Sequence, residues 1–273
     1  MPEGDSLRNI ARALTPLLEG QELVGLWTDG LRHPKLVGEL LGAPSARGKH
    51  LLIPIGEHAV LHVHLGLNGA WHVYRPGERW RLPGSRAPLR LETAKHTLPC
   101  FDPMLVELLD AKSVNRHPML ARLGPDLLDE APDLNDILDR ARGCGRLSIA
   151  AVLLDQKVAA GIGNIYKNEV LFIAGRHPWT VPTHLSDDDI LGLYALAAEL
   201  LRSNVRAGMR ATTPLSVQKR HRERFWVYGR AGAPCLRCGG RIQRRQQGDE
   251  GRDTMWCPRC QPAPPGASAP DWR

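Results

Sequence analysis

Four cysteines stand in two closely spaced pairs near the C-terminal end of the sequence. The pairs are Cys235-x2-Cys238 and Cys257-x2-Cys260, with 18 residues between them. Four thiolates at this spacing form a tetrahedral site that suits zinc and leave no open coordination position for catalysis. A redox role is the alternative, but the basic stretch over 241–252 is typical of a finger that contacts a partner. A segment of about 30 residues folds poorly without a metal, so we predict one structural Zn²⁺.

The second residue could do covalent chemistry. Removal of Met1 would leave Pro2 with a secondary α-amine, and α-amines have pKa values near 7.7–8.0, so a fair fraction is neutral at cellular pH. Attack by such an amine on a sugar C1′ gives an iminium ion, the electron sink that an elimination needs. A helix starting near Asp5 would lower the pKa of the amine further. Glu3 could protonate the sugar ring oxygen, or its charge could raise the pKa of the amine, and the sequence leaves both effects open.

A glycine-punctuated turn separates two helical stretches. Gly161 and Gly163 permit a tight turn, and Asn164 is a good N-cap for the helix that follows. Free backbone amides at such a helix start bind phosphate readily. An ordinary corner between two helices, closed by a capping asparagine, explains the same residues equally well.

Taken together, these motifs resemble the formamidopyrimidine-DNA glycosylase/endonuclease VIII family. The start Pro-Glu-Gly-Asp at residues 2–5 is similar to its catalytic N-terminus, and Arg-Gly-Lys-His-Leu-Leu at 47–52 to its strand motif with an essential lysine. The stretch 155–172 resembles its helix–two-turn–helix. The segment 227–230, the four cysteines and Gly-Arg-x-Thr at 251–254 resemble its C-terminus. The matches run in order over residues 2–261.

The resemblance implies a role for each matching residue. Pro2 would be the Schiff-base nucleophile, Glu3 the proton donor, and Lys49 a phosphate contact that assists catalysis. Asn164 and Arg252 would hold phosphates beside the extruded nucleotide, and an arginine on a zinc hairpin offers a rigid fork for that task. Without the neighbouring motifs, Lys49 would be read as a solvated strand residue.

Three details qualify the resemblance. Many relatives carry a second glutamate where this sequence has Ser6, so the proton relay around the opened sugar can differ. In the loop 64–69, Leu67 matches the bulky residue that relatives insert into the gap left by a flipped base. Strand alternation places four histidines on one polar face, and we do not expect a second metal site there. These histidines are His58, His62, His64 and His72.

The resemblance therefore implies a bifunctional DNA glycosylase and abasic-site lyase of base excision repair. It would remove oxidised bases through the Pro2 iminium and cleave the strand by β,δ-elimination. The Pro-Glu-Gly-Asp start looks closer to the endonuclease VIII branch, which favours oxidised pyrimidines. The alternatives are an enzyme that acts mainly as an abasic-site lyase, an oxidised-purine glycosylase, and a non-catalytic sensor of distorted DNA.

The elements that must position these residues change character along the chain. Leu7, Ile10, Leu14 and Leu18 recur at helical spacing behind a cap at Asp5 or Ser6, and Pro16 would end or bend this helix early. Short alternating runs over 23–27, 50–55, 59–65, 70–74 and 88–91 predict an antiparallel β-sandwich. An acidic, proline-containing linker follows at 128–135. Helices are expected over 135–141, 148–154, 164–174 and 187–202.

We therefore expect an α+β multidomain chain. A catalytic β-sandwich domain with a leading helix covers 1–120, and a helical helix–two-turn–helix domain covers 130–225. A four-cysteine zinc-finger hairpin covers 228–262, followed by a disordered tail over 263–273. Cys100 and Cys144 stand outside the finger and are expected to be buried thiols.

Composition and charge support a nucleic-acid partner. The 273 residues carry a net charge of +7, and within 201–260 there are 14 Lys/Arg against 4 Asp/Glu. Such a local surplus, mixed with Trp226, Tyr228 and Trp256, favours a polyanion over a merely solvated basic face. The sequence has no apolar run long enough to span a membrane and no signal peptide, so we expect a cytoplasmic monomer acting on damaged double-stranded DNA.

Overall fold

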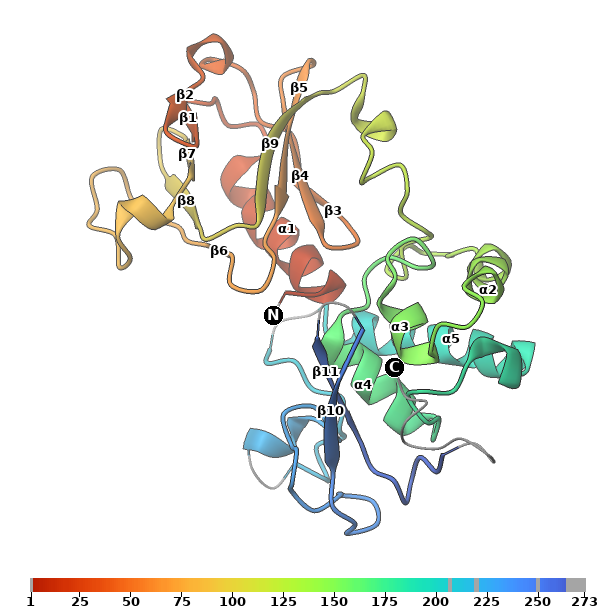
Figure 1. The fold of residues 1–273 in the computed structure, drawn as a ribbon. Helices are drawn as coiled ribbons and strands as arrows, with labels where there is room; N and C mark the ends of the chain where they lie inside the picture. The colour runs from red at the N-terminus through yellow and green to blue at the C-terminus, as the bar shows by residue number, and fades with distance from the viewer. Residues whose placement is uncertain (1, 206–207, 219–220, 249–250, 264–273) are drawn as a thin grey trace. The chain divides into compact units, whose positions relative to one another are not determined.

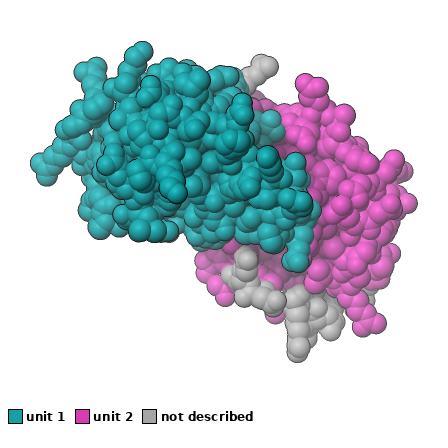
Figure 2. All heavy atoms as spheres, turned by 90° about the horizontal axis from the view of Figure 1, so that it is seen from above, with its two compact units in different colours: residues 1–122 teal, residues 123–273 magenta. Residues whose placement is uncertain are grey.

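The computed structural model describes residues 2–205, 208–218, 221–248 and 251–263, and the predicted disordered tail lies almost wholly outside them. The chain divides into two compact units, residues 1–122 and residues 123–273, which Figure 2 marks in separate colours. Each unit has its own hydrophobic core. No helix among these residues combines the length and the apolar character that crossing a membrane requires.

The first unit is a β-sandwich with a leading helix, as predicted. Helix α1 (Gly4–Leu18) packs against the hairpin of β3 (Ser45–Arg47) and β4 (His50–Ile55), and its apolar side chains join the core of the sandwich. One sheet has the order β3-β4-β5-β9 and the other β2-β1-β7-β8-β6, all pairs being antiparallel. The remaining strands are β1 (Gly25–Thr28), β2 (Leu31–Arg32), β5 (Ala59–His64), β6 (Ala70–Trp71), β7 (Leu89–Glu92), β8 (Thr97–Phe101) and β9 (Leu105–Asp110).

Two details of α1 differ from the prediction. The residue before the first turn is Glu3, in extended conformation, so neither Asp5 nor Ser6 is the cap. The helix continues through Pro16 to Leu18, because the anchoring of Leu14 and Leu18 in the core outweighs the backbone hydrogen bond that Pro16 cannot donate.

The second unit contains four α-helices and a β-hairpin among its described residues. The helices are α2 (Leu134–Gly143), α3 (Ile149–Leu154), α4 (Asn164–Ile173) and α5 (Asp187–Ser203). Strands β10 (Gln243–Gln247) and β11 (Arg252–Trp256) form the hairpin, and β11 packs against α4. Figure 1 draws both units with these labels.

Two predictions in the second unit are wrong. The stretch 128–135, expected as a linker, lies inside the second unit, which begins at residue 123, and its Leu128 and Leu134 pack against the core of that unit. The packing of these two leucines outweighs the acidic and proline-containing composition around them. In addition, the N-cap of α4 is Gly163, and Asn164 is the first helical residue with its side chain turned elsewhere.

Candidate functional site

The four finger cysteines converge on one point. Their sulfur atoms all lie within 4.8 Å of one another, with Cys235 Sγ 3.8 Å from Cys260 Sγ and Cys238 Sγ 3.4 Å from Cys257 Sγ. Tetrahedral zinc with Zn–S bonds of about 2.3 Å requires sulfur–sulfur separations of about 3.8 Å. The geometry therefore matches a zinc site.

The chemistry of this donor set also fits zinc. The backbone N–H groups of Arg237 and Gly240 donate to the sulfur atoms of Cys235 and Cys238. The Gly240 amide lowers the pKa of the Cys238 thiol to about 7, whereas burial raises the pKa of Cys257. Four thiolates this close need a cation to share their charge, so the finger holds one structural Zn²⁺ with no position left for substrate.

The predicted nucleophile and proton donor lie at the start of α1. Pro2 is partly exposed and directly precedes Glu3, whose side chain is fully buried. The helix begins at Gly4, so the positive end of its dipole faces the backbone nitrogen of residue 2.

Lys49 lies in a tight turn and not on a strand. With Gly48, which has φ +57°, it joins β3 to β4. The first residue of β4, His50, pairs with His64, the last residue of β5. Lys49 and the loop after His64 therefore lie at the same end of this sheet, and Figure 1 shows that end beside the start of α1.

The loop after β5 projects Leu67, which is 53 % exposed. Gly66 has φ +64°, and a Cβ atom there would lie 2.8 Å from the Cβ atom of Met104. The backbone N–H of Gly69 donates to the carbonyl of Leu65, and a Cβ atom at Gly69 would lie 2.3 Å from that oxygen. Glycine is thus required on both sides of the exposed leucine.

The histidines expected on one polar face are distributed differently. His58 is exposed in the turn before β5, whereas His62 is fully buried within that strand. His64 accepts a hydrogen bond from the backbone N–H of Gly66, and burial lowers its pKa to about 4. His72 follows β6 in the other sheet and hydrogen-bonds to Tyr74. The prediction is wrong for His62, which lies in the interior and not on an exposed polar face. Strand alternation predicts which residues share a face of a sheet, but not whether another part of the protein covers that face.

In the second unit, Asn164 and Arg252 are brought together. Asn164 is 6 % exposed, and its side-chain amide donates to the carbonyl of Asp253 at 3.0 Å. Arg252 is the first residue of β11 and directly precedes Asp253. This hydrogen bond joins the start of α4 to the finger hairpin at Asp253, directly after the predicted phosphate ligand Arg252.

Sequence reasoning missed a buried polar chain beneath this junction. Lys167 Nζ donates to Thr254 Oγ1 at 2.7 Å, Thr254 Oγ1 donates to Gln247 Oε1 at 2.7 Å, and Gln247 Nε2 donates to Ser148 Oγ at 2.6 Å. The four side chains come from α4, the two hairpin strands and the cap of α3, and all are at most 8 % exposed. The chain fixes the hairpin against both helices.

A buried carboxylate was missed as well. Glu169 of α4 is fully buried and accepts hydrogen bonds from the backbone N–H groups of Trp226, Val227 and Tyr228 and from the Thr212 hydroxyl. Burial raises the pKa of Glu169, and the four donors oppose that shift. A glutamate within an apolar helix was the available signal, because burial without partners would be costly.

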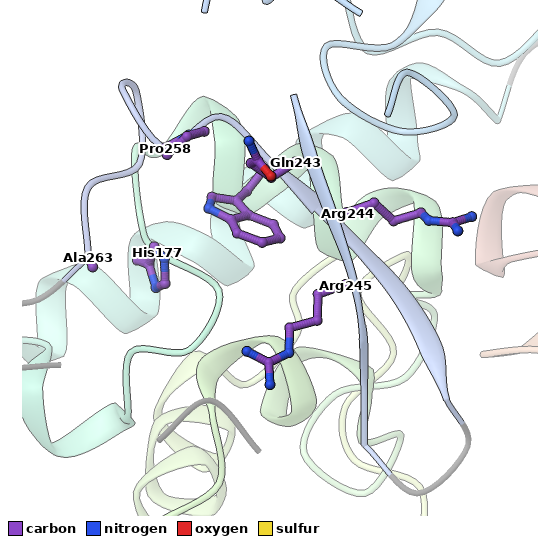
Figure 3. Close-up of a pocket in the computed structure, with 7 residues that line it drawn as sticks. His177, Gln243, Arg244, Arg245, Pro258 and Ala263 are labelled. Carbon is purple, nitrogen blue, oxygen red and sulfur yellow. The ribbon is translucent and has the colours of Figure 1, made fainter. Parts of the chain in front are cut away.

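Two hollows flank the hairpin. One, of about 570 Å³, lies between α3 and the hairpin and is bordered by Lys157 and Arg252, with the buried Lys167 in its wall. The other, of about 510 Å³, lies beside Trp256, where Figure 3 shows the side chains of Arg244 and Arg245 leaving β10 in different directions. Cationic side chains on both sides of the hairpin suit a phosphate backbone.

The sequence-predicted residues thus fall into two groups. Pro2, Glu3, Lys49 and Leu67 belong to the first unit, and Asn164, Arg252 and the zinc ligands belong to the second. Within each group the fold brings the candidates to one end of a sheet or to one helix–hairpin junction.

Three family models match the chain. Residues 1–107 match the formamidopyrimidine-DNA glycosylase N-terminal domain, residues 123–215 match the formamidopyrimidine-DNA glycosylase H2TH domain, and residues 232–263 match a zinc finger found in FPG and IleRS. Together they cover most of the sequence and coincide with the sandwich, the helices and the finger.

Relatives match over almost their whole length. A protein of Streptomyces coelicolor named "Probable endonuclease 8 2" is 36% identical over 97% of this chain and 95% of its own length. The "DNA-(apurinic or apyrimidinic site) lyase Nei2" of Mycolicibacterium smegmatis is 37% identical over 96% of this chain and 100% of its own length.

A solved structure gives the same result for the fold. The Lactococcus lactis Fpg in complex with DNA containing an abasic site superposes with a TM-score of 0.80 at 25% identity, covering 96% of this chain and 100% of that one. The chain therefore belongs to the formamidopyrimidine-DNA glycosylase/endonuclease VIII family of DNA-binding repair enzymes, which are DNA glycosylases and abasic-site lyases.

Proposed function

We propose that this enzyme excises oxidised pyrimidines from damaged double-stranded DNA and then cleaves the strand, with Pro2 as its nucleophile. The observation that carries the proposal is the start of α1. It combines a partly exposed Pro2 at the positive end of a helix with a buried Glu3 next to it.

The proposed reaction begins with the neutral Pro2 amine. Its lone pair attacks C1′ of the extruded nucleotide, and the bond from C1′ to the base breaks, so that the base leaves with the electron pair and takes up a proton. Glu3 donates a proton to the ring oxygen, which opens the sugar and leaves an iminium ion between Pro2 and C1′. Because proline is a secondary amine, this iminium carries a positive charge without further protonation.

The iminium then serves as an electron sink. Loss of a C2′ proton expels the 3′ phosphate, and a second elimination expels the 5′ phosphate; water finally hydrolyses the iminium and restores the amine. Lys49, at the sheet end that also carries the Leu67 loop, would hold a phosphate beside the lesion. Leu67 would fill the space that the extruded base leaves.

Asn164 and Arg252 would hold phosphates on the other unit. In favour of this role, Arg252 borders the cationic hollow beside α3, and the Asn164 side chain holds the backbone next to it. The zinc finger itself would only keep the hairpin folded, since its four thiolates complete the coordination of the metal.

A second candidate function is an abasic-site lyase with little base-excision activity. The Mycolicibacterium relative named as such a lyase is 37% identical to this chain, which favours this candidate on sequence grounds. A third, oxidised-purine excision, has support from similar structures such as MutM in complex with DNA containing carbocyclic 8-oxo-G.

One panel of duplexes separates these functions. Single-turnover rates of base release and strand incision would be measured on duplexes and single strands carrying an oxidised pyrimidine, 8-oxoguanine or an abasic site. We expect base release and incision together on oxidised pyrimidines. Incision of abasic DNA alone would favour the lyase, and faster release of 8-oxoguanine would refute the pyrimidine assignment.

We also propose that the enzyme acts as a monomer. Light scattering of the zinc-loaded protein, free and bound to a lesion duplex, should give one chain per particle and one chain per duplex. A dimer in either state would contradict this.

A further inference from the structure

A second group of metal-ligating side chains belongs to the sandwich unit, whereas the finger belongs to the second unit. It consists of His62 on β5, Glu107 on β9 and His117, which directly follows a short 3-10 helix at Val114–Arg116. One ligand atom from each residue lies within 4.8 Å of the other two. His62 and Glu107 are direct partners in the register of β5 and β9, so the sheet itself brings them together.

The two imidazoles converge on one carboxylate oxygen. Glu107 Oε2 lies 3.0 Å from His62 Nδ1 and 3.1 Å from His117 Nε2. Burial lowers the pKa of His62. In the tautomers that have a proton on each facing nitrogen, both rings donate to Glu107. A change of tautomer in each ring frees the same two lone pairs for a cation without any net loss of protons.

A further histidine supports the ring of His62 from behind. His62 Nε2 lies 2.8 Å from Nδ1 of His50, which is 4 % exposed. When His62 binds a metal through Nδ1, its proton moves to Nε2 and is donated to Nδ1 of His50, which then carries its own proton on Nε2. Metal-binding histidines commonly have their second nitrogen fixed by such a partner, which sets the ring orientation.

The group is buried on one side and open on the other. The side chain of His62 is fully buried, that of His117 is 14% exposed and that of Glu107 is 34% exposed. An ion can therefore enter past Glu107, and water can complete its coordination. Two imidazoles with one carboxylate favour first-row transition ions, whereas Mg²⁺ and Ca²⁺ prefer oxygen ligands alone.

We propose that His62, Glu107 and His117 bind one divalent transition-metal ion, such as Zn²⁺, at a site independent of the finger. The bound ion would connect β5 and β9 to the segment at His117. His62 stands two residues before the end of β5, from which the loop carrying Leu67 starts, so the ion would stabilise the strand that supports that loop. The inference does not depend on the proposed glycosylase function.

The test is the metal content of the full-length protein. Protein equilibrated with excess Zn²⁺ and freed of unbound ion should contain two zinc ions per chain by elemental analysis. Glu107→Gln and His117→Gln should each reduce this to one, and the exposed His58→Gln should retain two. One zinc per chain in the wild type at saturation, or two in both site variants, would overturn the proposal.

Titration with Co²⁺ gives a second readout that needs no variant. The finger cobalt produces thiolate-to-metal charge-transfer absorption, whereas a site of nitrogen and oxygen ligands does not. We expect a second equivalent to add only d–d absorption after the charge-transfer band is complete. Absence of any change beyond the first equivalent would overturn the proposal even if a variant failed to fold.

Discussion

The carboxylate of Glu169 offers a sharp test of how α4 holds the segment that leads into the finger. In Glu169→Gln one oxygen is replaced by an NH2 group of nearly the same shape. The Oε1 atom accepts from the N–H groups of Val227 and Tyr228, at 2.9 and 2.8 Å. The Oε2 atom accepts from the Trp226 N–H at 2.7 Å and from the Thr212 hydroxyl.

The expected cost follows from these donors. The new NH2 group is best accommodated at the Oε2 position, because the Thr212 hydroxyl can turn to accept, so that only the Trp226 N–H loses its partner. A buried unsatisfied N–H costs about 1–3 kcal/mol, and the remaining bonds lose the assistance of the charge. Relief of the buried charge offsets part of this, since burial already raises the pKa of Glu169. We expect a net loss of about 2 kcal/mol.

Hydrogen exchange is the most direct assay. A loss of about 2 kcal/mol in local stability should accelerate amide exchange in a peptide spanning 226–228 by about 30-fold. Glu199→Gln is the matched control, because it makes the same chemical change at a residue that is exposed on α5 of the same unit. Exchange in Glu169→Gln within twofold of the Glu199→Gln rate would refute the reasoning.

Three further predictions concern the hairpin and the cysteines. Thr254→Val removes the hydroxyl between Lys167 and Gln247 and should lower the free energy of unfolding by about 1–3 kcal/mol in urea titrations. An unchanged urea midpoint would show that these buried hydrogen bonds do not hold the hairpin. Arg252→Ala should weaken binding to duplex DNA and reduce the slope of log K against log salt by about 0.9. Arg244→Ala should reduce the slope less, because the Arg244 guanidinium lies 3.6 Å from the Asp253 carboxylate. Equal slopes for the two variants would contradict the phosphate role of Arg252. With zinc bound, a thiol reagent should label only the half-buried Cys144, because Cys100 is buried, and chelation should expose the four finger thiols; labelling that persists in zinc-bound Cys144→Ser would refute this.

The sequence anticipates the local elements better than their environment. Alternation and helical spacing identify β4 and the helices, because both patterns report which side chains face a core. Strands β8 and β9 escaped prediction: β8 contains Pro99 and is buried at every residue, so it shows no alternation. The extension of α1 through Pro16 and the packing of Leu128 and Leu134 depend on contacts with distant residues, which outweigh local propensity.

The candidate site divides in the same way. The four cysteines are predictable because ligand spacing is local, and the finger confirms them. Lys167, Glu169 and Thr254 lie within recognised motifs, but the sequence does not indicate the hydrogen bonds they make, because their partners lie up to 87 residues away in sequence. The group of His62, Glu107 and His117 depends on strand register, so the histidine pattern alone indicated no second metal site.

The central claim is that the Pro2 amine forms the covalent bond to DNA. Protein incubated with a duplex carrying an abasic site would be reduced with borohydride, digested with trypsin and nuclease, and analysed by mass spectrometry for the peptide that carries the sugar adduct. The account predicts that the adduct lies on Pro2 of the peptide 2–8 and that chains retaining Met1 form none. An adduct on Lys49 or another lysine, or undiminished cross-linking by chains that retain Met1, would contradict it.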